Sequence, residues 1–211
     1  MIRFVFCVLL SVLTMHTNGD LDEIAQQLVD AYEKQDYEAF MKAFPDDYDT
    51  FYELYGFDWK NGEKPLYHIG IEHVLFFFKD EDAIANKYLD KLLSLSEGFI
   101  WDADAPNIFA SKCNEVLHKY PNEITEFLKD KTDEEVVSFL RLCILTGFPT
   151  YDHYIEDYDA LSKEYASYSE RIVALLKTAR LMILNDPDAY EYCLFGPDGF
   201  PEAPKDKAMP K

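Results

Sequence analysis

The sequence predicts an all-α fold, an irregular multi-helix domain of about eight or nine helices. Three observations lead to this prediction. Apolar residues recur at intervals of three and four along most of the chain, the spacing that places them on one face of a helix. Residues that cap helices precede several of these runs, and Gly or Pro follows most of them. Fifteen Tyr and sixteen Phe exclude a disordered acidic chain, because such chains are poor in aromatic residues.

The N-terminus has the pattern of a secretory signal peptide over residues 1–19. One Arg is followed by an uncharged apolar run from Phe4 to Leu13, and small residues precede an expected cleavage point at Gly19-Asp20. The run is well short of the roughly 20 residues that span a bilayer. We therefore expect a protein that is exported to the periplasm or outside the cell, with no membrane anchor in the mature chain.

The remaining chain divides into a helical domain, residues 20–185, and a C-terminal extension, residues 186–211. Five prolines in the last 25 residues exclude a further long helix there. We expect the last ten or so residues to form a flexible tail.

Aspartates are expected to begin the helices in the first half of the domain. Asp20 is the expected N-cap of the first helix, Asp36 of the second, and Asp46 or Asp47 of the third. The apolar positions that mark these helices are Leu21, Ile24, Leu28, Tyr32, Phe40, Met41, Phe44, Phe51 and Leu54.

The middle of the domain is less regular. Residues 57–65 are expected to be a loop with a turn at Asn61-Gly62. Residues 66–78 are apolar enough for either a buried helix or a strand, and the helical surroundings favour a helix. One further helix is expected over residues 80–98, with Ile84, Tyr88, Leu92 and Leu95 on its apolar face.

In the second half, Pro106 and Pro121 are expected in the first turns of two helices. Thr132 and Glu135 form a capping-box pattern before the next. The longest helix is expected from Asp159 to Asn185, with one continuous apolar stripe: Leu161, Tyr165, Tyr168, Ile172, Leu175, Ala179 and Met182.

Successive antiparallel helices of this kind can stack as in HEAT or TPR proteins, and such stacking is the alternative to an irregular domain. No repeat of 34–45 residues with matching signature positions is present. The long stripe can pack inside the domain or against a second copy, so a monomer or a weak homo-oligomer is expected.

The segment DYEAFMKAFPDDYDTFYELYGFD, continuing to GEKPLYHIGIEHVLFFF, spans residues 36–78. It resembles a pattern in uncharacterised exported α-helical proteins of bacteria and covers about a quarter of the chain. The resemblance implies a helical fold and export, and it implies no activity.

The net charge of −20 excludes nucleic acid as a partner, because basic side chains must neutralise phosphates. It also disfavours an anionic membrane surface. A basic protein partner fits this charge, and solubility alone explains it equally well.

The four cysteines raise the questions of lipidation and disulfides. Cys7 lacks the small preceding residue of a lipoprotein signal. Cys113 and Cys143 fall on apolar faces of expected helices, and Cys193 lies in the C-terminal extension. An oxidising compartment permits a disulfide among the last three, and the sequence leaves open whether one forms.

No residue stands out as catalytic, cofactor-binding or metal-binding. His68 and His73 differ by one residue from an H-x-x-E-H spacing and diverge by roughly 140° around a helix, so one ion cannot bind both. Acidic loops, among them the one containing Asp102 and Asp104, lack the spacing of a calcium loop. No cofactor is expected.

Two segments combine tyrosines with acids. One spans residues 150–159 and the other spans residues 46–59. Tyrosine offers rigid contact area and carboxylates steer a basic partner. The predicted partner-binding residues are Tyr151, Asp152, His153, Tyr154, Glu156, Asp157 and Tyr158.

The sequence thus favours an exported acidic helical protein that acts through protein–protein contact, as an inhibitor or immunity protein or a component of an envelope complex does. The alternative is a carboxylate- or metal-dependent hydrolase of the cell envelope or the extracellular space.

Overall fold

The computed structural model describes residues 18–58, 60–100, 104–145 and 151–185, except for the side chains of residues 18, 151–157, 184 and 185. Eleven α-helices lie within these residues, with one 3-10 turn and one two-stranded hairpin. The prediction of an all-α multi-helix domain is confirmed. Residues 1–17 of the predicted signal peptide and the predicted C-terminal extension, including Cys193, lie outside the described residues.

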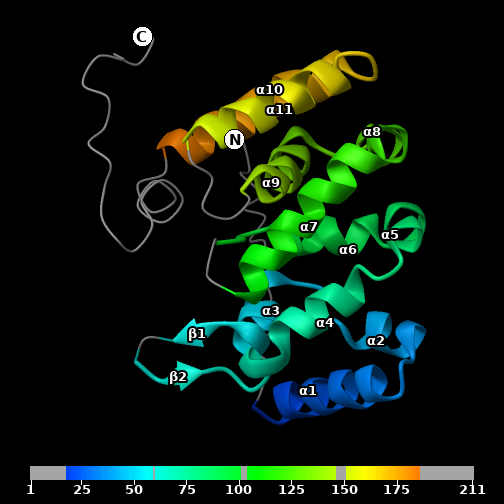
Figure 1. Ribbon diagram of the computed structural model, residues 1–211, viewed down its shortest axis with the longest axis vertical. Helices are drawn as coiled ribbons and strands as arrows, with labels where there is room; N and C mark the ends of the chain where they lie inside the picture. The colour runs from blue at the N-terminus through cyan, green and yellow to red at the C-terminus, as the bar shows by residue number, and fades with distance from the viewer. Residues whose placement is uncertain (1–17, 59, 101–103, 146–150, 186–211) are drawn as a thin grey trace, which may run out of the picture.

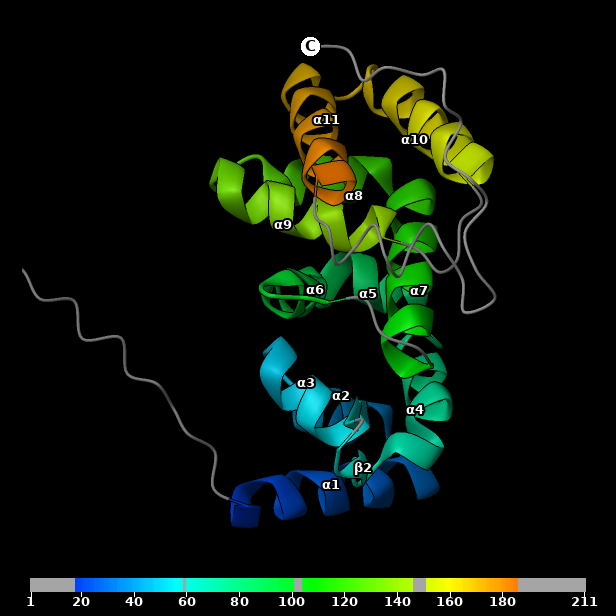
Figure 2. The same ribbon diagram turned by 90° about the vertical axis from the view of Figure 1, so that its left-hand side faces the viewer.

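The chain progresses along the long axis of the molecule, from α1 at one end to α10 and α11 at the other (Figure 1). Helix α7 runs nearly along this axis and packs on both α4 and α9 (Figure 2). The elements are α1 Asn18–Glu33, α2 Tyr37–Ala43, α3 Tyr48–Tyr55, β1 Phe57–Asp58, β2 Gly62–Glu63, η1 Tyr67–Ile69, α4 Gly70–Phe77, α5 Glu81–Lys87, α6 Leu89–Ser96, α7 Ala105–Lys119, α8 Pro121–Leu128, α9 Asp133–Ile144, α10 Tyr151–Tyr165 and α11 Glu170–Asn185.

One continuous hydrophobic core extends through the stack from α1 to α11. Its lower half is built from phenylalanines of several helices. The ring of Phe44 lies 4.5 Å from that of Phe77 between centroids, and Phe51 lies 5.4 Å from Phe109. These side chains are almost fully buried, so the aromatic content of the chain is largely a packing feature.

Several helix starts agree with the sequence. Asp36 and Asp47 accept hydrogen bonds from the backbone of α2 and α3, at 3.1 and 2.8 Å. Thr132 and Glu135 form both bonds of the capping box at the start of α9. Each bond satisfies a backbone N–H that has no partner within its own helix.

Two predictions about helix starts and lengths were wrong. Helix α1 begins at Asn18, so Asp20 lies in its first turn instead of capping it. The helix expected over residues 80–98 is two helices, α5 and α6, because the backbone leaves the helical region at Tyr88, with ψ of 15°. The Tyr88 hydroxyl donates to Glu38 at 3.1 Å. A contact between residues 50 apart in the sequence therefore lies at the point where the helix breaks. Such breaks raise the number of described helices above eight or nine.

The prediction of a single long helix over residues 159–185 was also wrong. The chain leaves the helix after Tyr165 and starts again at Glu170, where the Ser169 hydroxyl accepts from the backbone N–H of Ile172 at 3.2 Å. Tyr168, expected on the buried stripe, is 40% exposed. On α11, Ile172 and Ala179 are buried as predicted, Leu176 and Ile183 are buried with them, and Met182 is 50% exposed.

The middle segment is partly as expected. Residues 57–65 contain a short antiparallel pairing, Phe57 with Glu63 and Asp58 with Gly62, around the predicted turn. Gly62 has a φ of 89°, which glycine adopts without strain. Residues 66–78 are helical, with η1 leading into α4, as the sequence favoured.

Among the described helices, none combines the length and apolar character needed to cross a membrane.

Candidate functional site

The predicted partner-binding segment lies on α10, not in a loop. Its backbone is helical from Tyr151, and the side chains of residues 151–157 are outside the described set. Tyr158 is half-buried, and the guanidinium carbon of Arg180 lies 4.3 Å from its ring centroid. The ring of Tyr158 therefore already has an intramolecular partner between α10 and α11.

The second tyrosine-rich segment, residues 46–59, is not an aromatic contact surface. Tyr48 and Tyr55 are buried, and Tyr52 is half-buried. The hydroxyls of Tyr48 and Tyr52 donate to the carbonyls of Ile100 and Phe57, both at 2.8 Å. These tyrosines fix α3 in the fold, and among the described residues of this segment, 46–58, the exposed side chains are acids.

Histidine 73 and Tyr55 form a polar pair inside the lower core. His73 has no exposed surface, and its Nδ1 lies 3.0 Å from the Tyr55 hydroxyl. Its ring also packs on Tyr32 and Phe40, with centroids 4.9 and 5.3 Å away. Burial lowers the pKa of His73 from 6.5 to about 4, so the ring is neutral at pH 7.

This pair is closed to solvent and uncharged at pH 7. Burial raises the pKa of Tyr55 well above 10, so its hydroxyl stays protonated and can donate a hydrogen bond to Nδ1 of His73. That arrangement leaves the ring proton of His73 on Nε2, which has no hydrogen-bond partner among the described residues. No solvent reaches either group, whereas His68, expected to diverge from His73, is exposed.

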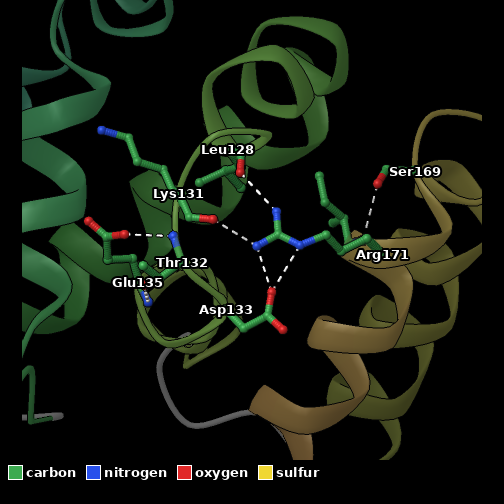
Figure 3. A network of polar contacts seen from close by, with 8 residues as sticks. Leu128, Lys131, Thr132, Asp133, Glu135, Ser169 and Arg171 are labelled. Carbon is green, nitrogen blue, oxygen red and sulfur yellow. Dashed lines mark hydrogen bonds and ion pairs between the residues drawn. The ribbon is translucent and has the colours of Figure 1, made fainter.

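A more promising surface lies where α9 and α11 begin. The Arg171 guanidinium on α11 donates to the carbonyls of Leu128 and Lys131, at 3.1 and 2.8 Å (Figure 3). It also donates twice to one carboxylate oxygen of Asp133, at 2.9 and 2.6 Å. Because these bonds join segments about 40 residues apart, the α8–α9 loop and the start of α11 are held together.

This region, which we call the acidic corner, is defined by Asp130, Asp133, Glu134, Tyr168 and Glu170. Asp130, Glu134 and Glu170 are exposed and make no hydrogen bond or ion pair with their side chains among the described residues. Carboxylates near helix N-termini are favoured by the helix dipole, which explains why acids gather there. The exposed ring of Tyr168 adds an aromatic surface.

The lysines beside the acidic corner are engaged with groups of the chain, and the charge of Asp130 also acts on Lys129. Lys129 forms an ion pair with Glu126, and Lys131 pairs with Asp90 at 2.8 Å and lies over the ring of Phe127. Across the part of the chain that the structure describes, no three His, Cys, Asp or Glu side chains are grouped to hold a metal ion. The exposed carboxylates of the corner can attract positive charge.

Basic side chains elsewhere in the fold also form hydrogen bonds and ion pairs with groups of the chain itself. Lys91 is only 11% exposed and donates to the carbonyl of Phe44 at 2.6 Å and to the carboxylate of Asp46. Other basic side chains in ion pairs are Lys34, Lys64, Lys87, Lys112, Lys119 and Arg171.

In contrast to the basic side chains, many carboxylates of the described residues make no hydrogen bond or ion pair. Exposed acids whose side chains have no hydrogen bond or ion pair within the described ranges are Asp22, Glu33, Asp49, Glu63, Glu72, Glu97, Glu123, Asp130, Glu134, Asp159 and Glu170. Many carboxylates of the described residues are thus exposed to solvent without a partner, while most of the described basic side chains have one.

Sequence reasoning missed the acidic corner because it placed Tyr168 inside a continuous helix. The stretch Ala166-Ser167-Tyr168-Ser169 carried a signal of the break, since Ser is a preferred N-cap residue. Comparison of the chain with protein-family models, curated proteins and solved structures finds no match.

Proposed function

We propose that this chain is an exported acidic helical protein that works by binding a basic protein partner. The observation that carries the proposal is the imbalance at its surface. Most described lysines and arginines are engaged within the molecule, while many exposed carboxylates make no hydrogen bond or ion pair with other described residues. Such a surface attracts positive charge over a distance of about one Debye length.

The contact face that we propose includes α10 and the acidic corner. Helix α10 lies at one end of the stack and packs on α11 and α9 (Figure 2). The corner is at the C-terminal end of α10, where Tyr168 and Glu170 are exposed. Residues 151–158 remain part of this proposal because they lie on the same helix.

The test is capture of partners from an extract of the exported fraction, at about 20 mM and about 200 mM salt. One triple variant carries Asp130→Asn, Glu134→Gln and Glu170→Gln. The matched control carries Glu33→Gln, Glu63→Gln and Glu97→Gln, which changes the net charge equally at exposed acids away from the corner.

We expect capture of a basic protein at low salt. Its affinity should fall roughly tenfold in the corner variant, since three exposed ion pairs are worth up to about 2 kcal/mol together. The control variant should bind within about twofold of the parent. Recovery of no basic protein at low salt, or equal weakening in both variants, would contradict a specific role for the corner.

A further inference from the structure

Two cysteines from different helices meet in the upper core. Cys113 lies on α7 and Cys143 lies on α9, and neither side chain has any exposed surface. The two helices pack directly against each other (Figure 1). Both are free thiols in this structure, and the Cys143 thiol is near enough to Cys113 to raise its pKa. Two sulfurs are therefore placed side by side at a helix–helix contact.

The surroundings of this pair do not provide another role for it. Two thiolates are too few to hold a structural zinc ion, which takes four ligands. The nearby Tyr165 hydroxyl donates to the carbonyl of Leu117 at 2.8 Å, so it is not available as a base. Burial and the neighbouring thiol raise the pKa of Cys113 well above its usual value, which makes it a poor nucleophile in the folded chain.

We propose that Cys113 and Cys143 form a disulfide when the chain folds under oxidising conditions, so that the pair is a covalent cross-link between α7 and α9. The cross-link closes a loop that contains α8 and the segment from Leu128 to Asp133, to which Arg171 binds. It does not depend on partner binding.

The oxidant in this reaction is a disulfide such as glutathione disulfide. One cysteine thiolate attacks it and releases one glutathione thiolate, which gives a mixed disulfide. The second cysteine thiolate then attacks the protein sulfur of that mixed disulfide and releases the second glutathione. Two protein thiols lose two protons and two electrons, and one glutathione disulfide is reduced to two glutathione molecules.

Burial determines when this reaction takes place. Neither an external disulfide nor a reductant can reach sulfur atoms that have no exposed surface. The bond must therefore form before α7 and α9 are fully packed. After folding, the disulfide is protected from reductants until the chain opens.

The test uses the full chain with Cys7→Ser and Cys193→Ser, so that Cys113 and Cys143 are the only thiols. The protein is reduced in denaturant, refolded with reduced and oxidised glutathione, quenched with acid and alkylated in denaturant. We expect an intact mass two units lower than that of the reduced chain, with no alkyl group added. Addition of two alkyl groups after complete refolding would overturn the proposal.

Thermal unfolding gives a second measurement. A cross-link that closes a loop of about 30 residues should raise the midpoint by on the order of 10 °C relative to the reduced chain. Cys113→Ala and Cys143→Ala should each abolish this difference between oxidised and reduced samples. A difference that persists in either variant would overturn the assignment of the bond.

Two further experiments test which cysteines are joined and when the disulfide forms. With Cys193 restored, peptide mapping should still find Cys113 joined to Cys143, and a bond from either residue to Cys193 would refute the pairing. Protein folded while reduced and then given glutathione disulfide should oxidise at least tenfold more slowly than the unfolded chain. Equal rates would refute formation before packing.

Discussion

His73 should make the stability of this protein depend on pH in a specific range. Its pKa is lowered from 6.5 to about 4, mainly by burial, and the nearby charge of Glu72 only partly opposes this shift. Below pH 6.5 the unfolded chain binds a proton at this histidine that the folded chain does not bind. The stabilisation is therefore complete above pH 6.5 and is lost as the pH falls to about 4.

The size of the effect follows from the difference between the two pKa values. At about 1.4 kcal/mol per pKa unit, the free energy of unfolding should fall by about 3 kcal/mol between pH 7 and pH 4 through this one residue. Carboxylates titrate over part of the same range, so the total pH dependence of the parent does not isolate His73. A comparison with a non-titrating variant does.

The informative variant is His73→Asn, whose side-chain oxygen can accept from the Tyr55 hydroxyl in place of Nδ1. It should be less stable than the parent at pH 7, because it leaves space among Tyr32 and Phe40. Urea unfolding at several pH values should show this difference shrinking by about 3 kcal/mol on going to pH 4. The exposed His68→Asn should follow the parent throughout. Parallel curves for the parent and His73→Asn would refute a buried neutral His73.

Two further substitutions test the packing of the stack. Gly70→Ala should lower the free energy of unfolding by about 1–2 kcal/mol, because its methyl group would lie 2.9 Å from the β-carbon of Ala105 on α7; denaturant unfolding of a variant as stable as the parent would contradict that close approach. Arg171→Ala should cost about 2 kcal/mol through loss of its bonds to Leu128, Lys131 and Asp133, whereas Lys177→Ala on the same helix should change stability by less than about 0.5 kcal/mol.

The elements that the sequence predicted correctly depend on local interactions. Asp36 and Asp47 cap helices that begin at the next residue, and Thr132 bonds to Glu135 three residues later. The helix breaks that the sequence did not predict depend on interactions between residues far apart in the chain. Tyr88 has the same apolar spacing whether the helix continues or stops, and its contact with Glu38 is 50 residues away in sequence.

The candidate site follows the same division. That His68 and His73 diverge was visible from their spacing, but the partner of His73 is Tyr55, 18 residues earlier. The acidic corner exists because Arg171 reaches carbonyls about 40 residues earlier in the chain. A hydrogen bond between such segments leaves no periodicity in the sequence, so only the folded chain reveals it.

The tyrosines show that composition alone does not identify a contact surface. Fifteen of them in an acidic chain suggest an aromatic binding face, yet several of their hydroxyls reach backbone carbonyls inside the fold. Tyr37 donates to Phe77, Tyr48 to Ile100 and Tyr165 to Leu117, each at 2.8 Å. Each bond ties a tyrosine ring to the backbone of a helix or loop far away in the sequence. A tyrosine used in this way cannot contact a partner, so the free carboxylates, and not the aromatic content, carry the argument for binding.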